Sequence, residues 1–69
     1  MFTYTTEKAS YIADNQNIER SLIHAICGSG DTKPTGWAEG SDCIEINKST
    51  GATKIYFYDA TGEAWVEAK

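Results

Sequence analysis

A glycine-rich segment divides this chain into two parts with different hydrophobic periodicities. Residues 28–41 contain four of the six glycines and the only proline, Pro34. Glycine and proline interrupt regular secondary structure, and the residue before a proline avoids the helical region. We therefore expect a loop over residues 29–42 that joins an N-terminal element to a C-terminal one.

The length of the chain limits what it can do. Its 69 residues predict a single domain, residues 1–69. A chain of this size buries only about 60% of its unfolded surface, so its fold is marginal alone and gains stability from a partner, an oligomer, a metal or a disulfide. A deep catalytic cleft needs walls as well as a core, which argues against an enzyme.

The N-terminal part has a helical pattern over residues 6–28. Gly28 is a typical helix end. The polar run at residues 14–17 favours helix caps, so one long helix and two short helices both remain open. Phe2-Thr3-Tyr4 alternates and is compatible with an additional short strand. The apolar stripe with helical spacing consists of Tyr11, Ile18, Leu22 and Ile26.

The C-terminal part, residues 43–67, has the alternation of an antiparallel β-meander. Three runs that alternate apolar and polar residues are separated by turn sequences that contain Gly51 and Gly62. Such a small sheet is stable only when one face is covered. We therefore predict an α+β fold, in which an N-terminal helix, or two short helices, packs on a three-stranded antiparallel β-meander.

The two faces of the predicted meander differ in character. The apolar residues that we expect against the helix are Ile44, Ile46, Ile55 and Phe57. The opposite face is then aromatic, and interface cores are enriched in Tyr and Trp. The alternative is that the tyrosines only satisfy strand propensity, with hydrated hydroxyls. The loop tryptophan is expected to pack on the sheet or on a partner. The candidate protein-binding residues are Trp37, Tyr56, Tyr58 and Trp65.

No motif predicts catalysis, a metal site or a cofactor. His24 and Cys27 lie one helical turn apart, but neither an oxyanion hole nor a substrate groove is evident. The sequence lacks the paired Cys or His spacing of a zinc site, the EF-hand pattern and the phosphate-loop pattern. We expect a non-enzymatic protein with no cofactor and no small-molecule substrate.

The charge of the chain restricts its partners. Ten acidic and six basic residues give a net charge of −4, and the basic residues are dispersed. Direct nucleic-acid binding and binding to an anionic membrane are therefore not expected. The apolar runs are too short for a membrane span, and no signal pattern is evident. The two thiols, Cys27 and Cys43, are either bridged or free.

Residues 31–67 contain a series of short motifs: Gly40-Ser41, Glu45-Ile46, Thr50-Gly51, Tyr56-Phe57-Tyr58-Asp59 and Trp65-Val66. This series resembles the pattern of a group of small proteins of tailed phages and prophages. The chain departs from the group at Asn47, where Asp is usual, and in a longer first turn, Lys48 to Thr53. The resemblance does not cover the N-terminal part.

The resemblance implies a virion protein. We expect a non-enzymatic capsid decoration, head-fibre or tail-associated protein, made in the bacterial host cytoplasm, that binds other virion proteins or its own copies. The resemblance carries over no catalytic residue. The alternative is a small acidic phage-encoded inhibitor that binds a host protein such as a nucleic-acid enzyme.

Overall fold

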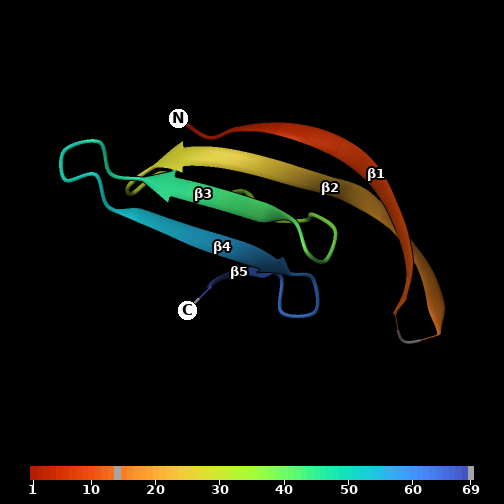
Figure 1. The fold of residues 1–69 in the computed structure, drawn as a ribbon. Coiled ribbons are helices and arrows are strands. Elements are labelled where there is room, and N and C mark those ends of the chain that lie inside the picture. The colour runs from red at the N-terminus through yellow and green to blue at the C-terminus, as the bar shows by residue number, and fades with distance from the viewer. Residues whose placement is uncertain (14, 69) are drawn as a thin grey trace.

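The structure is a computed structural model that describes residues 1–13 and 15–68, and these form one five-stranded mixed sheet (Figure 1). The strands lie side by side in chain order. The parallel pair is β2 with β3, and all other neighbours are antiparallel. The strands are β1 (Thr3–Ala13), β2 (Gln16–Gly28), β3 (Asp42–Ile46), β4 (Thr53–Asp59) and β5 (Ala64–Glu67).

The predicted helix over residues 6–28 is wrong. This part of the chain is the long antiparallel hairpin of β1 and β2, and the part that the structure describes contains no helix. The fold class is therefore all-β and not α+β. Residues four apart share a face of a strand as well as a face of a helix, so Ile18, Leu22 and Ile26 satisfy both patterns. The β-branched residues near the start of β1 favour the strand.

The polar run at residues 14–17, of which the structure describes 15–17, coincides with the end of the hairpin. Ala13 pairs with Gln16, so the connection is short. Asn15 has a φ of 61°, a left-handed conformation that asparagine tolerates better than most residues and that tight hairpin turns require. The residues that weaken the helical pattern thus specify a turn.

The C-terminal prediction is confirmed. The strands β3, β4 and β5 are consecutive antiparallel neighbours, which is the β-meander expected over residues 43–67. The alternating run Phe2-Thr3-Tyr4 also enters a strand, because β1 begins at Thr3.

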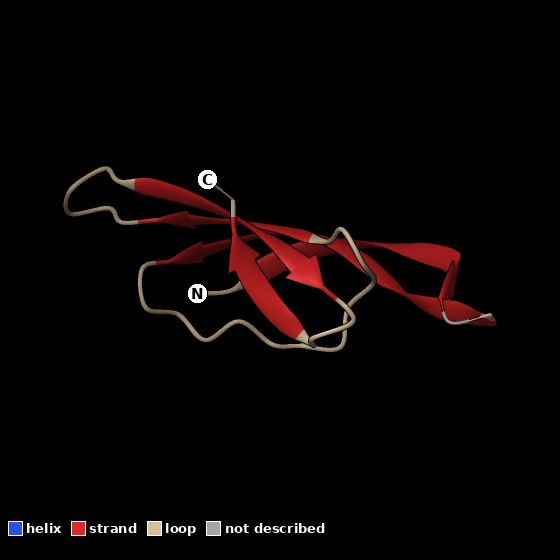
Figure 2. Ribbon diagram, turned by 90° about the horizontal axis from the view of Figure 1, so that it is seen from below, coloured by secondary structure: helices blue, strands red, loops and turns tan. Residues whose placement is uncertain are grey.

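A covering loop, residues 29–41, packs on one face of the sheet in the place expected for the helix. Figure 2 shows this long loop along one side of the strands. The loop is held to β2 by a hydrogen bond of 2.9 Å from the Ala38 N–H to the Ser21 carbonyl. The Ser41 hydroxyl accepts a second bond, of 3.0 Å, from the Ile23 N–H. We call this side the covered face; its core residues are Ile23, Ala25, Cys27 and Cys43.

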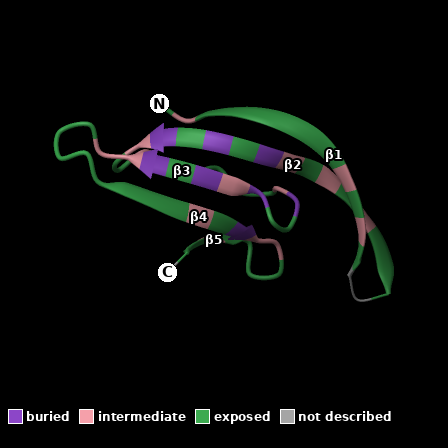
Figure 3. Ribbon diagram, viewed as in Figure 1, coloured by how far each residue is buried: buried purple, intermediate pink, exposed green. Residues whose placement is uncertain are grey.

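Burial alternates along the central strands, as Figure 3 shows for β2 and β3. Ile23 and Cys43 are fully buried on the covered face, whereas Ile26, one residue before Cys27, is 53% exposed. The sheet therefore has one covered face and one face that no other part of the described chain covers.

Candidate functional site

The four predicted contact residues all belong to the covered face. Tyr56 is paired with Cys43, and Tyr58 is paired with Trp65. Trp37 packs against the same core from the covering loop. Tyr58 is only 2% exposed. The structure thus brings these residues together, but it engages them in contacts within the chain.

Aromatic packing holds this face closed. The rings of Tyr58 and Trp65 have centroids 5.1 Å apart, and those of Tyr4 and Trp37 are 5.2 Å apart. The Tyr58 hydroxyl accepts a hydrogen bond of 2.8 Å from the Gly36 N–H of the covering loop. Each such ring pair contributes about 0.5–1.5 kcal/mol beyond its buried area. The aromatic residues therefore stabilise the loop on the sheet.

A buried ion pair adds to this closure. The Lys33 ammonium lies 2.7 Å from the Glu45 carboxylate and 4.4 Å from the centre of the Tyr56 ring. Burial alone lowers the pKa of Lys33, but the hydrogen bond and charge of Glu45 outweigh burial and raise that pKa. Because Glu45 is largely buried, its charge needs this partner.

The opposite face carries a continuous row of apolar side chains. Ile26 is paired with Ile44, and Ile44 with Ile55, so one row crosses β2, β3 and β4. Phe57 is paired with Val66 in the next row. We define the open face as Ile26, Ile44, Ile55, Phe57 and Val66, which are between 36% and 53% exposed. Together they expose on the order of 400 Å², a size at which apolar patches are often functional.

The sequence predicts correctly which residues share this face, but the environment that it predicts for them, packed against a helix, is wrong. Ile44, Ile46, Ile55 and Phe57 do share a face, as their alternation predicts. They do not contact a helix, because the N-terminal part of the chain forms the hairpin of β1 and β2 instead. The covering loop packs on the opposite face of the sheet. Which face is covered depends on the path of the loop, and the local pattern contains no signal for that path.

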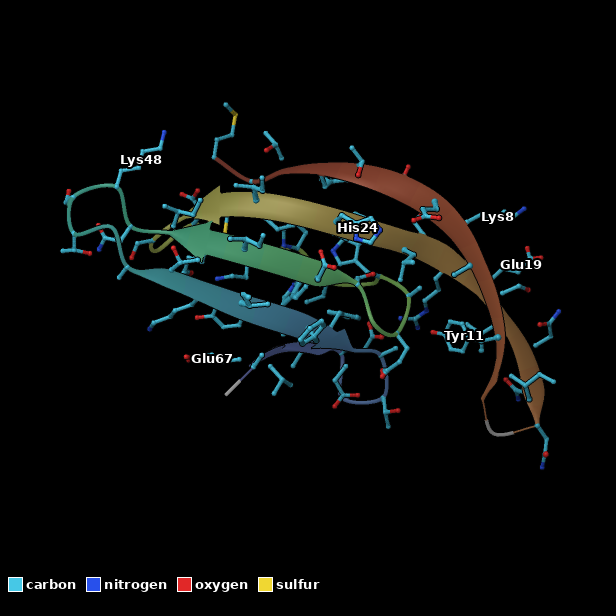
Figure 4. All side chains as sticks on the ribbon, viewed as in Figure 1. Lys8, Tyr11, Glu19, His24, Lys48 and Glu67 are labelled. Atoms are coloured by element: carbon cyan, nitrogen blue, oxygen red, sulfur yellow. The ribbon has the colours of Figure 1, made fainter. Side chains whose placement is uncertain are left out.

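A polar cluster borders the open face at His24 (Figure 4). Its Nε2 lies 3.0 Å from Glu7 of β1, and its Nδ1 lies 3.1 Å from Asp42 of β3. The pKa of His24 is raised above its usual value. The hydrogen bond with Glu7 is the largest cause, and the hydrogen bond with Asp42 is the second largest. The sequence does not reveal this cluster, because it forms only when β1 and β3 flank β2.

Within residues 1–13 and 15–68, no group of three or more His, Cys, Asp or Glu side chains is arranged to hold a metal ion. The same residues include no helix of the length and apolarity needed to cross a bilayer.

No protein-family model, curated protein or solved structure matches the chain.

Proposed function

We propose that this protein is a non-enzymatic structural component of a tailed-phage particle that docks its open face on another virion protein. The observation that carries the proposal is the contiguous open face on a sheet whose other face is already closed. The resemblance of residues 31–67 to small phage proteins supports a virion setting, as a capsid decoration, head-fibre or tail-associated protein made in the host cytoplasm.

The charges around the open face favour a partner with an apolar centre and a basic rim. By register, Glu7, Asp42 and Asp59 share the side of the sheet that carries the open face, and Glu7 and Asp42 flank the single imidazole of His24 there. Arg20 shares it too, but its guanidinium is paired with Glu63. A second copy of the chain would bring acidic rims together at a net charge of −4 each, which opposes self-association through this face. A partner with Lys or Arg around an apolar patch complements it.

The size of the molecule is compatible with a standard interface. It measures 45 × 22 × 16 Å, so its broad side has room for the ~800 Å² per partner of stable complexes, with the open face as the apolar centre of that area. Docking also stabilises a domain that has few buried residues, because a partner that binds only the folded state shifts the folding equilibrium. A particle that repeats the partner many times presents it at a high effective concentration.

The alternative, an acidic inhibitor of a nucleic-acid enzyme, has less support. Such an inhibitor needs free carboxylates to occupy a basic groove. Four of the ten acidic residues are paired with a lysine, an arginine or the N-terminal ammonium: Glu19, Asp31, Glu45 and Glu63. Two more, Glu7 and Asp42, share the single imidazole of His24.

Co-sedimentation with purified particles of the phage that encodes the chain tests the proposal. We expect the double variant Ile55→Ser/Phe57→Ser to bind at least about tenfold more weakly, because each lost apolar burial costs about 1.5–3 kcal/mol. Ile12→Ser is the matched control, because Ile12 is 79% exposed and lies outside the open face. It should bind like the wild type.

Two results would remove the proposal. Wild-type binding by the double variant excludes the open face as the docking surface. A stable homodimer in sedimentation equilibrium that the double variant abolishes assigns this face to a second copy of the chain instead of a virion partner.

A further inference from the structure

Two buried thiols meet beneath the covering loop. The Sγ atoms of Cys27 on β2 and Cys43 on β3 are 3.4 Å apart, and both cysteines are free. Cys27 is paired with Glu45, and Cys43 with Ala25, so the two cysteines are diagonal neighbours on adjacent parallel strands. Their side chains share the covered face and point toward each other.

We infer that Cys27 and Cys43 form a reversible disulfide, which makes this pair a redox-modification site in the core. A disulfide needs its sulfurs at about 2.05 Å, so they must approach by roughly 1.4 Å. Both side chains lie on one face of hydrogen-bonded strands. Because diagonal neighbours have Cα atoms about 7–8 Å apart, at the upper limit for a disulfide, the approach combines side-chain rotation with a small shift of β2 relative to β3. The two are the only cysteines in the sequence, which leaves no competing pairing within the chain.

Cys27 is the more accessible of the two cysteines. It is 3% exposed and lies one residue before the end of β2, where it borders a surface hollow lined by Gly28, Ser29 and Lys48. Cys43 is fully buried and does not border this hollow. An oxidant therefore reaches Cys27 first, when local opening of the covering loop exposes its side chain.

The order of the two steps follows from this difference. Burial and the hydrogen bond with Cys27 raise the pKa of Cys43 to about 12, so Cys43 stays protonated and does not react first. The Cys27 thiolate attacks one sulfur of the oxidant and releases the other half as a thiolate. Cys43 then gives its proton to the released thiolate and attacks the Cys27 sulfur, which releases the second half. Two protein thiols are oxidised and one small disulfide is reduced to two thiols.

The bridge would close the segment that contains the whole covering loop. It links Cys27, which precedes the loop, to Cys43, which follows it. These residues lie on β2 and β3, the parallel pair, which no hairpin turn connects. A cross-link of this span stabilises a small domain by restricting its unfolded state. Thiols stay reduced in a cytoplasm and oxidise outside it. The timing, bridge formation after particle release, rests on the proposed function; the bridge itself does not.

Oxidation of the purified full chain tests the inference. After equilibration with excess glutathione disulfide, we expect the intact mass to fall by two hydrogens, free thiols to disappear, and dithiothreitol to reverse both changes. The melting temperature of the bridged form should exceed that of the reduced form by roughly 10 °C or more. Cys43→Ala should instead keep a glutathione adduct on Cys27.

Three results would overturn the inference: two free thiols after equilibration, glutathione adducts without a bridge in the wild type, or a bridge that lowers the melting temperature. These wild-type measurements decide the question even when Cys43→Ala does not fold. They are also independent of docking, because the open face does not include either cysteine, so loss of particle binding and failure of oxidation are separate outcomes.

Discussion

Trp37 and Trp65 donate their indole N–H groups to the same acceptor, the Pro34 carbonyl oxygen, at 2.8 and 2.9 Å. A carbonyl oxygen has two lone pairs and can accept both bonds. Trp37 and Pro34 belong to the covering loop and Trp65 to β5, the last strand of the sheet. The shared acceptor therefore ties the loop to the far edge of the sheet, and it explains why one face is closed while the other stays open.

Substitution of Trp65 tests this closure. Trp65→Phe removes one hydrogen bond but keeps a ring, so we expect a loss of about 1 kcal/mol in the free energy of unfolding. Trp65→Ala also removes the ring and should cost about 3 kcal/mol. Val66→Ala on the open face is the control, with an expected change within about 1 kcal/mol. Urea unfolding measures all three, and equal losses for Trp65→Ala and Val66→Ala would rule out the closing role.

Tyr58 should behave as a core residue. Tyr58→Phe leaves the Gly36 N–H without its acceptor, which should cost about 1 kcal/mol. The double variant Tyr56→Ser/Tyr58→Ser removes two rings from the covered face. We expect it to lose most of its cooperative thermal transition, because the cost of each large cavity, about 3–5 kcal/mol, rivals the total stability of a domain this small. A double variant with an unchanged melting curve would contradict this placement.

The Lys33–Glu45 pair predicts a strong asymmetry between single and double substitutions. Lys33→Met leaves a buried carboxylate without its partner, which should cost about 3 kcal/mol. Adding Glu45→Gln removes the stranded charge, so the double variant should regain at least half of the loss. A double-mutant cycle in urea measures the coupling. Additive effects of the two substitutions would show that the pair is not coupled.

His24 predicts a pH dependence of stability. Glu7 and Asp42 raise the pKa of His24 in the folded state. Its contribution is therefore complete below the unfolded-state pKa of about 6.5 and is lost as the pH rises through the raised folded-state pKa. The difference in melting temperature between wild type and His24→Gln should be larger near about pH 5.5 than near about pH 8.5.

Thr5→Ala is the control for this experiment. Thr5 of β1 is paired with His24 of β2, and its side chain does not titrate. The change in melting temperature that Thr5→Ala causes should therefore be the same near about pH 5.5 and near about pH 8.5. A His24→Gln difference that grows toward alkaline pH would contradict the assigned direction.

The N-terminal half shows how sequence patterns can mislead. Ile18, Leu22 and Ile26 are four residues apart, and this spacing fits one face of a helix or of a strand equally well. Only the pairing of β2 with β1 decides between them. One local signal is Asn15, an asparagine that adopts the left-handed backbone of a hairpin turn, but in a polar run it also resembles a helix cap.

The C-terminal half was more predictable, because its alternation is strict and its turns contain glycine. The sequence places Tyr56 and Tyr58 on one face and Ile55 and Phe57 on the other, and the register agrees. Whether a face is open is a separate question. The answer depends on the contact of Pro34 and Trp37 with Trp65. Pro34 and Trp65 are about thirty residues apart in the sequence, and no local pattern predicts a contact between them.

Site-specific photo-cross-linking tests the central claim, docking through the open face, most directly. Two preparations of the chain each carry a photoreactive phenylalanine analogue. In one the analogue replaces Phe57 of the open face, and in the other it replaces Ile12, which is exposed but lies outside the open face. Each preparation is mixed with purified particles. We predict that the chain labelled at Phe57 becomes covalently joined to a virion protein and that the chain labelled at Ile12 does not. Cross-links from Ile12 alone, or between two copies of the chain at Phe57, would contradict it.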